Sequence, residues 1–121
     1  MKTVLIVDDN KEDLRTLKAL LESQGYKVTS ATNGVEALKA ARKSPPDVTL
    51  SDILMPVMDG FEFIAQVRKK LEYAEVPVIF VTSHQEESSQ ELAFQLGARG
   101  YIVKDESFCE AIMESVERVL G

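Results

Sequence analysis

The strongest constraint on the fold is a regular alternation of two kinds of segment along the chain. Five short stretches rich in β-branched residues are predicted as strands, and they cover residues 3–7, 27–31, 48–52, 76–82 and 100–104. The first, third and fourth are continuous apolar runs, which is typical of strands that are buried on both faces. The sequence therefore predicts an α/β fold in which helices cover both sides of a parallel sheet.

Five helices are predicted in the intervals after the strands, because apolar residues recur there at helical spacing. The apolar stripes are Leu14, Leu17 and Leu21; Val35, Leu38 and Ala41; Ile64, Val67 and Leu71; Leu92 and Leu96; and Ile112, Val116 and Val119. Capping-box patterns begin three of the helices: Asn33 with Glu36, Asp59 with Glu62, and Ser107 with Glu110. Gly25 and Gly97 follow the first and fourth stripes, where glycine commonly ends a helix.

Composition limits the class of protein. The 121 residues carry 14 Lys+Arg against 20 Asp+Glu, a formal net charge of −6, and we expect residues 1–121 to form a single globular domain. The apolar runs are far shorter than the roughly 20 residues of a membrane span or the core of a signal peptide. The lone Cys109 cannot form an internal disulfide, so a cytoplasmic location is expected. The acidic balance and the lack of a basic cluster argue against direct binding of nucleic acid.

Chemically active side chains stand at the ends of the predicted strands. When right-handed crossovers join parallel strands, the carboxyl ends of the strands form one edge of the sheet, and ligands bind there. These ends carry Asp8 and Asp9, Asp52, Thr82, and Lys104. We therefore expect these five residues to form one site, although their positions in the chain lie far apart.

Three carboxylates in one cleft repel one another and require a compensating cation. Mg²⁺ prefers oxygen ligands, and Asp9 and Asp52 are the best direct candidates, with Asp8 binding directly or through water. A carboxylate can also act as a nucleophile and form an aspartyl phosphate, provided that a metal and a fixed cation neutralise the transferring group. Lys104 would be that cation, and the Thr82 hydroxyl could donate a hydrogen bond to a phosphoryl oxygen.

Four motifs in order give the chain a family resemblance: VDDN at 7–10, DILMPVMDG at 52–60, VTS at 81–83 and GYIVK at 100–104. Together they resemble the CheY-like receiver domains of two-component response regulators, and the resemblance covers the whole chain. It implies a flavodoxin-like (βα)5 fold, a doubly wound five-stranded parallel sheet with strand order 2-1-3-4-5.

The resemblance also implies a chemical role for the residues of the first two motifs. Asp52 matches the phosphoacceptor, which takes a phosphoryl group from a sensor histidine kinase or a phosphotransfer protein. Asp8 and Asp9 match the acidic pair that holds Mg²⁺, and the carbonyl of Leu54 matches the backbone ligand. Such a domain is no enzyme in the usual sense, because it catalyses only its own phosphorylation and slow dephosphorylation.

The last two motifs match residues that report the phosphorylation state. Thr82 matches the switch hydroxyl, Tyr101 matches the aromatic switch residue, and Lys104 matches the lysine that pairs with the phosphoryl group. In this family the fourth helix, fifth strand and fifth helix form the surface that a downstream effector protein or output domain reads, and a dimer on activation is possible.

Three positions depart from the family pattern. Lys104 is followed by Asp105 where most receivers have a proline in a cis peptide, so we expect a trans bond or a different loop course, which puts the position of Lys104 in question. Leu54 and His84 flank the route by which water would reach an aspartyl phosphate. Because an apolar Leu54 offers water no hydrogen bond, slow self-hydrolysis is expected.

Purely structural roles compete with these assignments. Asp8 and Asp9 could cap the first helix, and Tyr101 could simply cover the edge of the sheet. Thr82 could be an ordinary strand residue, and Lys104 an ordinary surface lysine. Asp59 and Gly60 are assigned to a turn and cap that begin the third helix, with Met55 and Met58 packing nearby.

Other functions remain to be weighed against phosphoacceptance. A pseudo-receiver would use the same fold as a constitutive interaction module. A flavodoxin-like protein would bind flavin mononucleotide at this edge, but Asp8 and Asp9 would repel its phosphate. A haloacid dehalogenase-type hydrolase needs a second aspartate where Leu54 stands, and this reading is discarded. The sequence leaves open whether the chain is a stand-alone receiver or part of a longer regulator.

Overall fold

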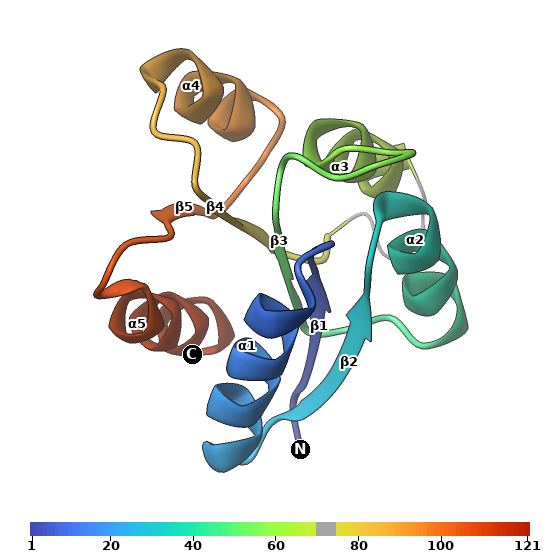
Figure 1. Cartoon of the computed structure of the whole chain (residues 1–121). Coiled ribbons are helices and arrows are strands. Elements are labelled where there is room, and N and C mark those ends of the chain that lie inside the picture. The colour runs from blue at the N-terminus through green and yellow to red at the C-terminus, as the bar shows by residue number, and fades with distance from the viewer. Residues whose placement is uncertain (70–74) are drawn as a thin grey trace.

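The computed structural model of the chain describes residues 1–69 and 75–121. Strands and helices alternate throughout this part of the chain (Figure 1): β1 (Thr3–Val7), α1 (Lys11–Ser23), β2 (Lys27–Ala31), α2 (Gly34–Lys43), β3 (Val48–Ser51), α3 (Gly60–Lys69), β4 (Val78–Thr82), α4 (Glu87–Gln95), β5 (Gly100–Val103) and α5 (Phe108–Leu120). Each predicted strand and helix is present, with small differences at the ends. Leu71 of the third apolar stripe lies outside the described residues.

All the strand pairs are parallel, and the sheet has the order β2-β1-β3-β4-β5. The predicted flavodoxin-like topology is thus confirmed. Every residue of β3 and β4 is buried, and so are four of the five residues of β1, whereas the edge strand β2 is largely exposed. The continuous apolar runs in the sequence therefore correspond to the three strands in the middle of the sheet, which helices cover on both faces.

Two helical layers enclose the sheet (Figure 1). Helices α1 and α5 pack on one face, where Ile6 of β1 meets Leu21 and Ile112 in a fully buried cluster. Helices α2 and α3 cover the other face, where Leu5 meets Phe63. Neighbouring residues of β1 thus point to opposite layers, and fully burying side chains of this size contributes about 1.5–3 kcal/mol each.

Two of the three predicted capping boxes begin their helices with the expected side-chain cap. Asn33 Oδ1 accepts a hydrogen bond from the Glu36 backbone N–H at 2.9 Å, and Asp59 Oδ1 accepts one from Glu62 at 2.9 Å. The prediction for Ser107 is wrong, because its hydroxyl donates instead to Asp105 Oδ1 at 3.0 Å. The Ser107 hydroxyl therefore bonds to the carboxylate of Asp105 and does not cap α5.

The ends of the strands differ from the prediction in a way that matters for the site. Asp52 and Lys104 lie one residue beyond β3 and β5, although both were predicted to be the last strand residues. Each backbone still bonds to the neighbouring strand. The N–H of Asp52 donates to Val7 O at 2.9 Å, and the N–H of Lys104 donates to Thr82 O at 2.8 Å. Both side chains thus begin loops while their backbones remain anchored to the sheet.

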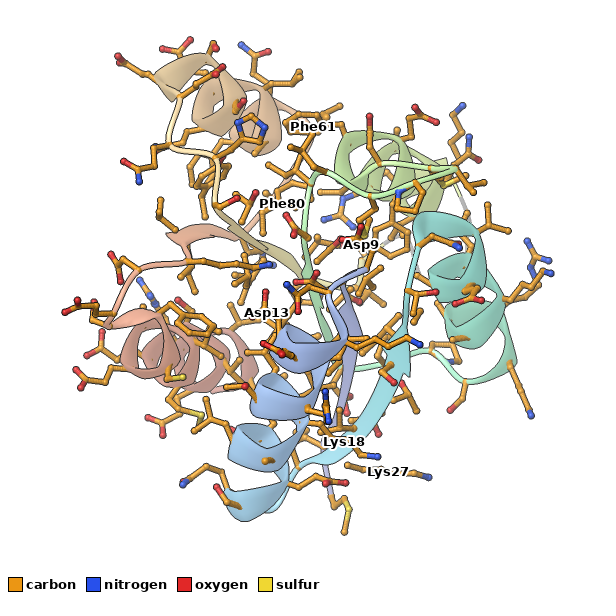
Figure 2. The ribbon with its side chains drawn as sticks, viewed as in Figure 1. Asp9, Asp13, Lys18, Lys27, Phe61 and Phe80 are labelled. Atoms are coloured by element: carbon orange, nitrogen blue, oxygen red, sulfur yellow. The ribbon has the colours of Figure 1, made fainter. Side chains whose placement is uncertain are left out.

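Close backbone packing fixes the segment behind Asp52. The backbone N–H of Gly60 donates to Ile53 O at 2.8 Å, and a Cβ at position 60 would lie 2.9 Å from Ile53 Cα and collide with Asp52 O. Only glycine allows this approach. The neighbouring rings of Phe61 and Phe80 meet edge to face with centroids 5.7 Å apart (Figure 2).

Candidate functional site

The structure brings the three predicted carboxylates together at the carboxyl ends of β1 and β3. Asp8, Asp9 and Asp52 each offer an oxygen, and these oxygens lie within 4.8 Å of one another. Asp8 and Asp52 are buried, whereas Asp9 is exposed at the rim (Figure 2). Capping of α1 falls to Asn10, whose side chain accepts hydrogen bonds from the backbone N–H groups of Glu12 and Asp13. The acidic pair is therefore not used as the helix cap.

The ammonium group of Lys104 lies within this carboxylate cluster. Its Nζ donates three hydrogen bonds: to Asp8 Oδ2 at 2.6 Å, Asp13 Oδ2 at 2.8 Å and Asp52 Oδ2 at 3.0 Å. The side chain of Lys104 is 14% exposed, so the ion pairs are only weakly screened by solvent. An ammonium has three N–H donors, and all of them find carboxylate partners here.

Asp13 is a site residue that sequence reasoning missed. It lies in the first turn of α1, four residues after Asp9, and points toward the rim (Figure 2). One signal was available in the sequence. A helix that begins directly after a strand-end acidic pair places its first-turn side chains over the same edge of the sheet.

Burial and ion pairing act in opposite directions on the pKa values of this cluster. Desolvation lowers the pKa of Lys104, but the hydrogen bonds that its ammonium donates to Asp13, Asp8 and Asp52 outweigh this effect and raise the pKa well above its usual range. For Asp8, desolvation dominates and raises the pKa, although the bond from Lys104 opposes the shift. Lys104 is therefore charged at neutral pH, while the negative charge on Asp8 is only partly compensated.

The missing proline does not displace Lys104. The Lys104–Asp105 peptide is trans, as is every peptide bond that the structure describes. The loop is held instead by Asp105, whose N–H donates to Val103 O at 2.8 Å and whose Oδ1 accepts from the N–H of Ser107 at 2.9 Å. Lys104 thus reaches the cluster with a trans bond.

Thr82 and Tyr101 both bond to the backbone of His84. Thr82 Oγ1 is buried and accepts a hydrogen bond from the His84 N–H at 3.3 Å. The Tyr101 hydroxyl donates to the His84 carbonyl oxygen at 3.0 Å. Desolvation raises the pKa of Tyr101, and the negative charge of Asp52 adds to the effect. His84 thereby connects Thr82, at the end of β4, to Tyr101 in the edge strand β5.

The loop that follows Asp52 exposes two apolar side chains. Leu54 is 59% exposed and Val57 is 81% exposed. Val57 has a φ of 71°, and the Met58 N–H donates to Pro56 O at 2.8 Å across it. A positive φ is strained for a β-branched residue. Met55 and Met58 pack against the core as predicted, which holds the base of this loop.

The donor set fits a hard divalent cation. Three carboxylates gather in one half-buried cluster, and carboxylate oxygens are the ligands that Mg²⁺ prefers. The single ammonium of Lys104 leaves the cluster with excess negative charge, which a divalent cation would offset. The residues present therefore suit a divalent cation such as Mg²⁺, which the carboxylates of Asp8, Asp9 and Asp52 could hold.

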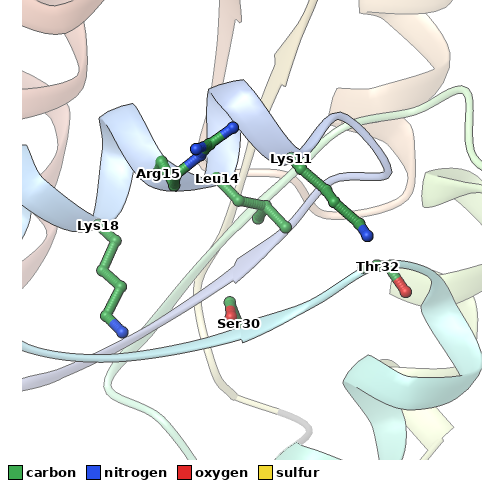
Figure 3. Close-up of a pocket in the computed structure, with 6 residues that line it drawn as sticks. All are labelled: Lys11, Leu14, Arg15, Lys18, Ser30 and Thr32. Atoms are coloured by element: carbon green, nitrogen blue, oxygen red, sulfur yellow. The ribbon is translucent and has the colours of Figure 1, made fainter.

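A second charged region lies between α1 and the edge strand β2, and we call it the basic groove. Figure 3 shows its lining: Lys11, Leu14, Arg15, Lys18, Ser30 and Thr32. Its three cations form no ion pair with any described residue. The expectation that the chain has no basic cluster is wrong for this surface, because helical spacing brings separated cations to one face.

Comparison with known proteins decides the family. The family model of the response regulator receiver domain matches residues 4–117. The chain belongs to the response regulator receiver domain family. Protein PilH of Pseudomonas aeruginosa is 38% identical, with alignment over 100% of this chain and 99% of PilH. The chemotaxis protein CheY4 of Vibrio cholerae has a crystal structure that superposes with a TM-score of 0.92 at 36% identity, covering 99% of both chains.

Longer regulators also match this receiver. The alkaline phosphatase synthesis transcriptional regulatory protein PhoP of Bacillus subtilis is 38% identical over 85% of this chain, which corresponds to 42% of PhoP. Similar sequences thus occur both as nearly the whole of a short protein and as part of a longer one. None of the described helices is both long and apolar enough to span a bilayer.

Proposed function

We propose that residues 1–121 form a single phosphoacceptor receiver domain and that Asp52 accepts a phosphoryl group from a sensor histidine kinase or a phosphotransfer protein. One observation carries the proposal: the Asp52 carboxylate lies in a single cluster with Asp8, Asp9 and the Lys104 ammonium. A phosphoryl group carries several negative charges, and transfer to a carboxylate requires that they be neutralised.

The Asp52 carboxylate is held in one orientation for this reaction. Its Oδ1 accepts a hydrogen bond from the Ile53 N–H at 2.7 Å, while its Oδ2 faces Lys104 at 3.0 Å. One carboxylate oxygen attacks phosphorus, and the donor nitrogen leaves with the bonding electrons. Lys104 pairs with the phosphoryl oxygens, because it is the charged cation nearest to the acceptor among the described residues.

Mg²⁺ would be held by Asp8, Asp9 and Asp52 with the backbone carbonyl of Leu54. When bound, it would supply positive charge that offsets the charge of the transferring phosphoryl group. The excess of carboxylates over ammonium groups in the cluster supports this assignment. The domain would act as an enzyme only on itself, in its own phosphorylation and slow dephosphorylation.

Phosphorylation would be read through Thr82 and Tyr101. The Thr82 hydroxyl would give up its bond from His84 and turn toward the phosphoryl group, and Tyr101 would follow because it bonds to the same residue. These movements would alter the surface of α4, β5 and α5, which a downstream effector or an output domain binds, with a dimer as one outcome. The lone thiol of Cys109 suits the reducing cytoplasm, and a kinase would transfer the phosphoryl group to the domain there.

Leu54 would lengthen the life of the phosphorylated form. Its side chain is apolar and exposed beside the acceptor, and it offers an attacking water no hydrogen bond. Replacement by asparagine, Leu54→Asn, would supply such a bond and should shorten the half-life of the aspartyl phosphate. Decay can be followed by mass spectrometry after removal of the phosphodonor. An unchanged or longer half-life would remove Leu54 from this role.

The proposal is tested by incubating the domain with acetyl phosphate and Mg²⁺ and measuring its intact mass. We expect a mass gain of one phosphoryl group in the wild type, no gain in Asp52→Asn, and no gain when a chelator removes Mg²⁺. The backbone amide spectrum of Asp52→Asn should match that of a folded domain. A wild type that gains no mass would instead identify the chain as a pseudo-receiver.

A further inference from the structure

Asp13 is the partner of Lys104 that stands outside the group of potential metal ligands. The oxygens of Asp8, Asp9 and Asp52 gather within 4.8 Å, and Asp13 is not among them. Yet Asp13 Oδ2 lies 2.8 Å from Lys104 Nζ, closer than Asp52 Oδ2 at 3.0 Å. The Lys104 ammonium thus contacts Asp8 and Asp52, which belong to the group of potential metal ligands, and Asp13, which does not.

We propose that Asp13 is a positioning residue that holds the Lys104 ammonium at the rim while Asp8 and Asp52 are engaged by Mg²⁺. This inference rests on the proposed function, because it concerns the lysine that would meet the phosphoryl group. A cation that takes the oxygens of Asp8 and Asp52 competes with Lys104 for them. Asp13 is then the carboxylate in contact with Nζ that remains available.

The backbone around Asp13 is fixed well enough for such a role. Its N–H donates to the Asn10 side chain at 3.1 Å, and the Asn10 N–H donates in turn to Asp8 Oδ1 at 2.9 Å. The first turn of α1 is therefore tied to the same cluster that contains Lys104. A carboxylate on a capped helix end is a firmer anchor than one on a free loop.

The loop that carries Lys104 does not by itself fix the lysine side chain. Lys104 begins the loop after β5, and it is followed by Asp105 rather than by a rigid proline. The loop bonds of Asp105 are local, to Val103 and Ser107, so they do not fix the lysine side chain. Of the three carboxylates on Nζ, Asp13 alone links it to a helix, α1.

An ordinary surface ion pair is the competing explanation. Such pairs contribute little and are screened by salt. The geometry favours a stronger contact, because the Asp13 side chain is 27% exposed and that of Lys104 only 14% exposed. Glu12 provides a matched control, since it is an exposed acid in the same helical turn and forms no ion pair with any described residue.

The test is NMR of the lysine ammonium groups in ¹⁵N-labelled protein, with and without Mg²⁺, with the Lys104 signal assigned from its loss in Lys104→Met. In Mg²⁺-bound wild type, the Lys104 signal should persist with slow hydrogen exchange. Asp13→Asn should speed that exchange by ~10-fold, the effect expected for losing a charge-assisted bond. Asp13→Glu should restore slow exchange, and Glu12→Gln should leave it unchanged.

Equal exchange of the Lys104 ammonium in wild type and Asp13→Asn, with both backbone amide spectra folded, would overturn the positioning role. So would equal effects of Asp13→Asn and Glu12→Gln, since these would indicate only a change in net charge. Failure of the proposed function would look different. In that case wild type would gain no mass from acetyl phosphate or show no Mg²⁺-dependent shifts, while the metal-free spectrum would still test the contact between Asp13 and Lys104.

Discussion

Helix α1 borders two charged regions that differ sharply in how their charges are used. At its amino end, the carboxylate cluster surrounds Lys104, which is mostly buried and makes three ion pairs. Along its side, the basic groove gathers exposed cations that pair with no described residue (Figure 3). The difference teaches that burial and pairing, rather than the number of charges, determine where charge contributes to stability and chemistry.

The largest effect should follow from removing the buried cation. Lys104→Met leaves the carboxylates with no ammonium partner, so we expect the free energy of unfolding to fall by about 2–3 kcal/mol, somewhat below the ~3–5 kcal/mol seen when one partner of a fully buried pair is removed. Urea denaturation without Mg²⁺ measures this loss. Added Mg²⁺ should recover part of the stability, because it binds only the folded cluster.

Lys18→Met is the matched control for that experiment, since it removes an exposed lysine of the basic groove, on α1. It should change the free energy of unfolding by less than about 0.5 kcal/mol. Similar losses in Lys104→Met and Lys18→Met would remove the distinction between the two regions.

A smaller effect of opposite sign should follow from Asp8→Asn. Burial raises the pKa of Asp8 above its value in the unfolded chain, so its contribution to stability is present at low pH and is lost as pH rises through the folded-state pKa. At neutral pH without metal, Asp8→Asn should therefore raise the free energy of unfolding by about 0.5–2 kcal/mol. Two carboxylates remain to pair with Lys104.

The pH dependence of the Asp8 effect provides its check. The advantage of Asp8→Asn should shrink as pH falls below the ordinary aspartate value of 3.8, because Asp8 is then neutral in both states. Chemical denaturation at neutral and acidic pH measures the two differences. An advantage that grows toward low pH would mean that burial does not control this carboxyl group.

The smallest effect is expected in the basic groove. Arg15→Gln removes an exposed guanidinium with no ion-pair partner among the described residues, so stability should change by less than about 0.5 kcal/mol. The rate of mass gain from acetyl phosphate should also stay within error of wild type. A loss above about 1 kcal/mol in thermal or urea denaturation would show that groove charges are as firmly engaged as those around Lys104.

Much of the fold could be predicted because its signals are local or follow from topology. Continuous apolar runs identified the central strands, and parallel pairing then required that Asp8, Asp52 and Lys104 meet at one edge. The trans bond predicted after Lys104 is confirmed, and the question that the missing proline raised about the position of this lysine did not allow for its carboxylate partners. Attraction to a buried acidic cluster holds this lysine with a trans peptide.

The features that sequence reasoning missed depend on how distant segments face each other. Asp13 reaches Lys104 only because α1 lies beside the loop after β5, a relation between residues 91 positions apart. Ser107 was expected to cap α5, but Asp105 competes for its hydroxyl. The basic groove also joins two elements, since its cations come from α1, Ser30 comes from β2, and Thr32 follows β2 directly.

The central claim is that Asp52 is the residue that receives the phosphoryl group. The most direct test treats the wild-type domain with acetyl phosphate and Mg²⁺, reduces the acyl phosphate with borohydride, and locates the resulting homoserine by peptide mass spectrometry. We predict homoserine at position 52 and unmodified aspartate at positions 8, 9 and 13. Homoserine at any of those other positions, or none at position 52, would contradict the account.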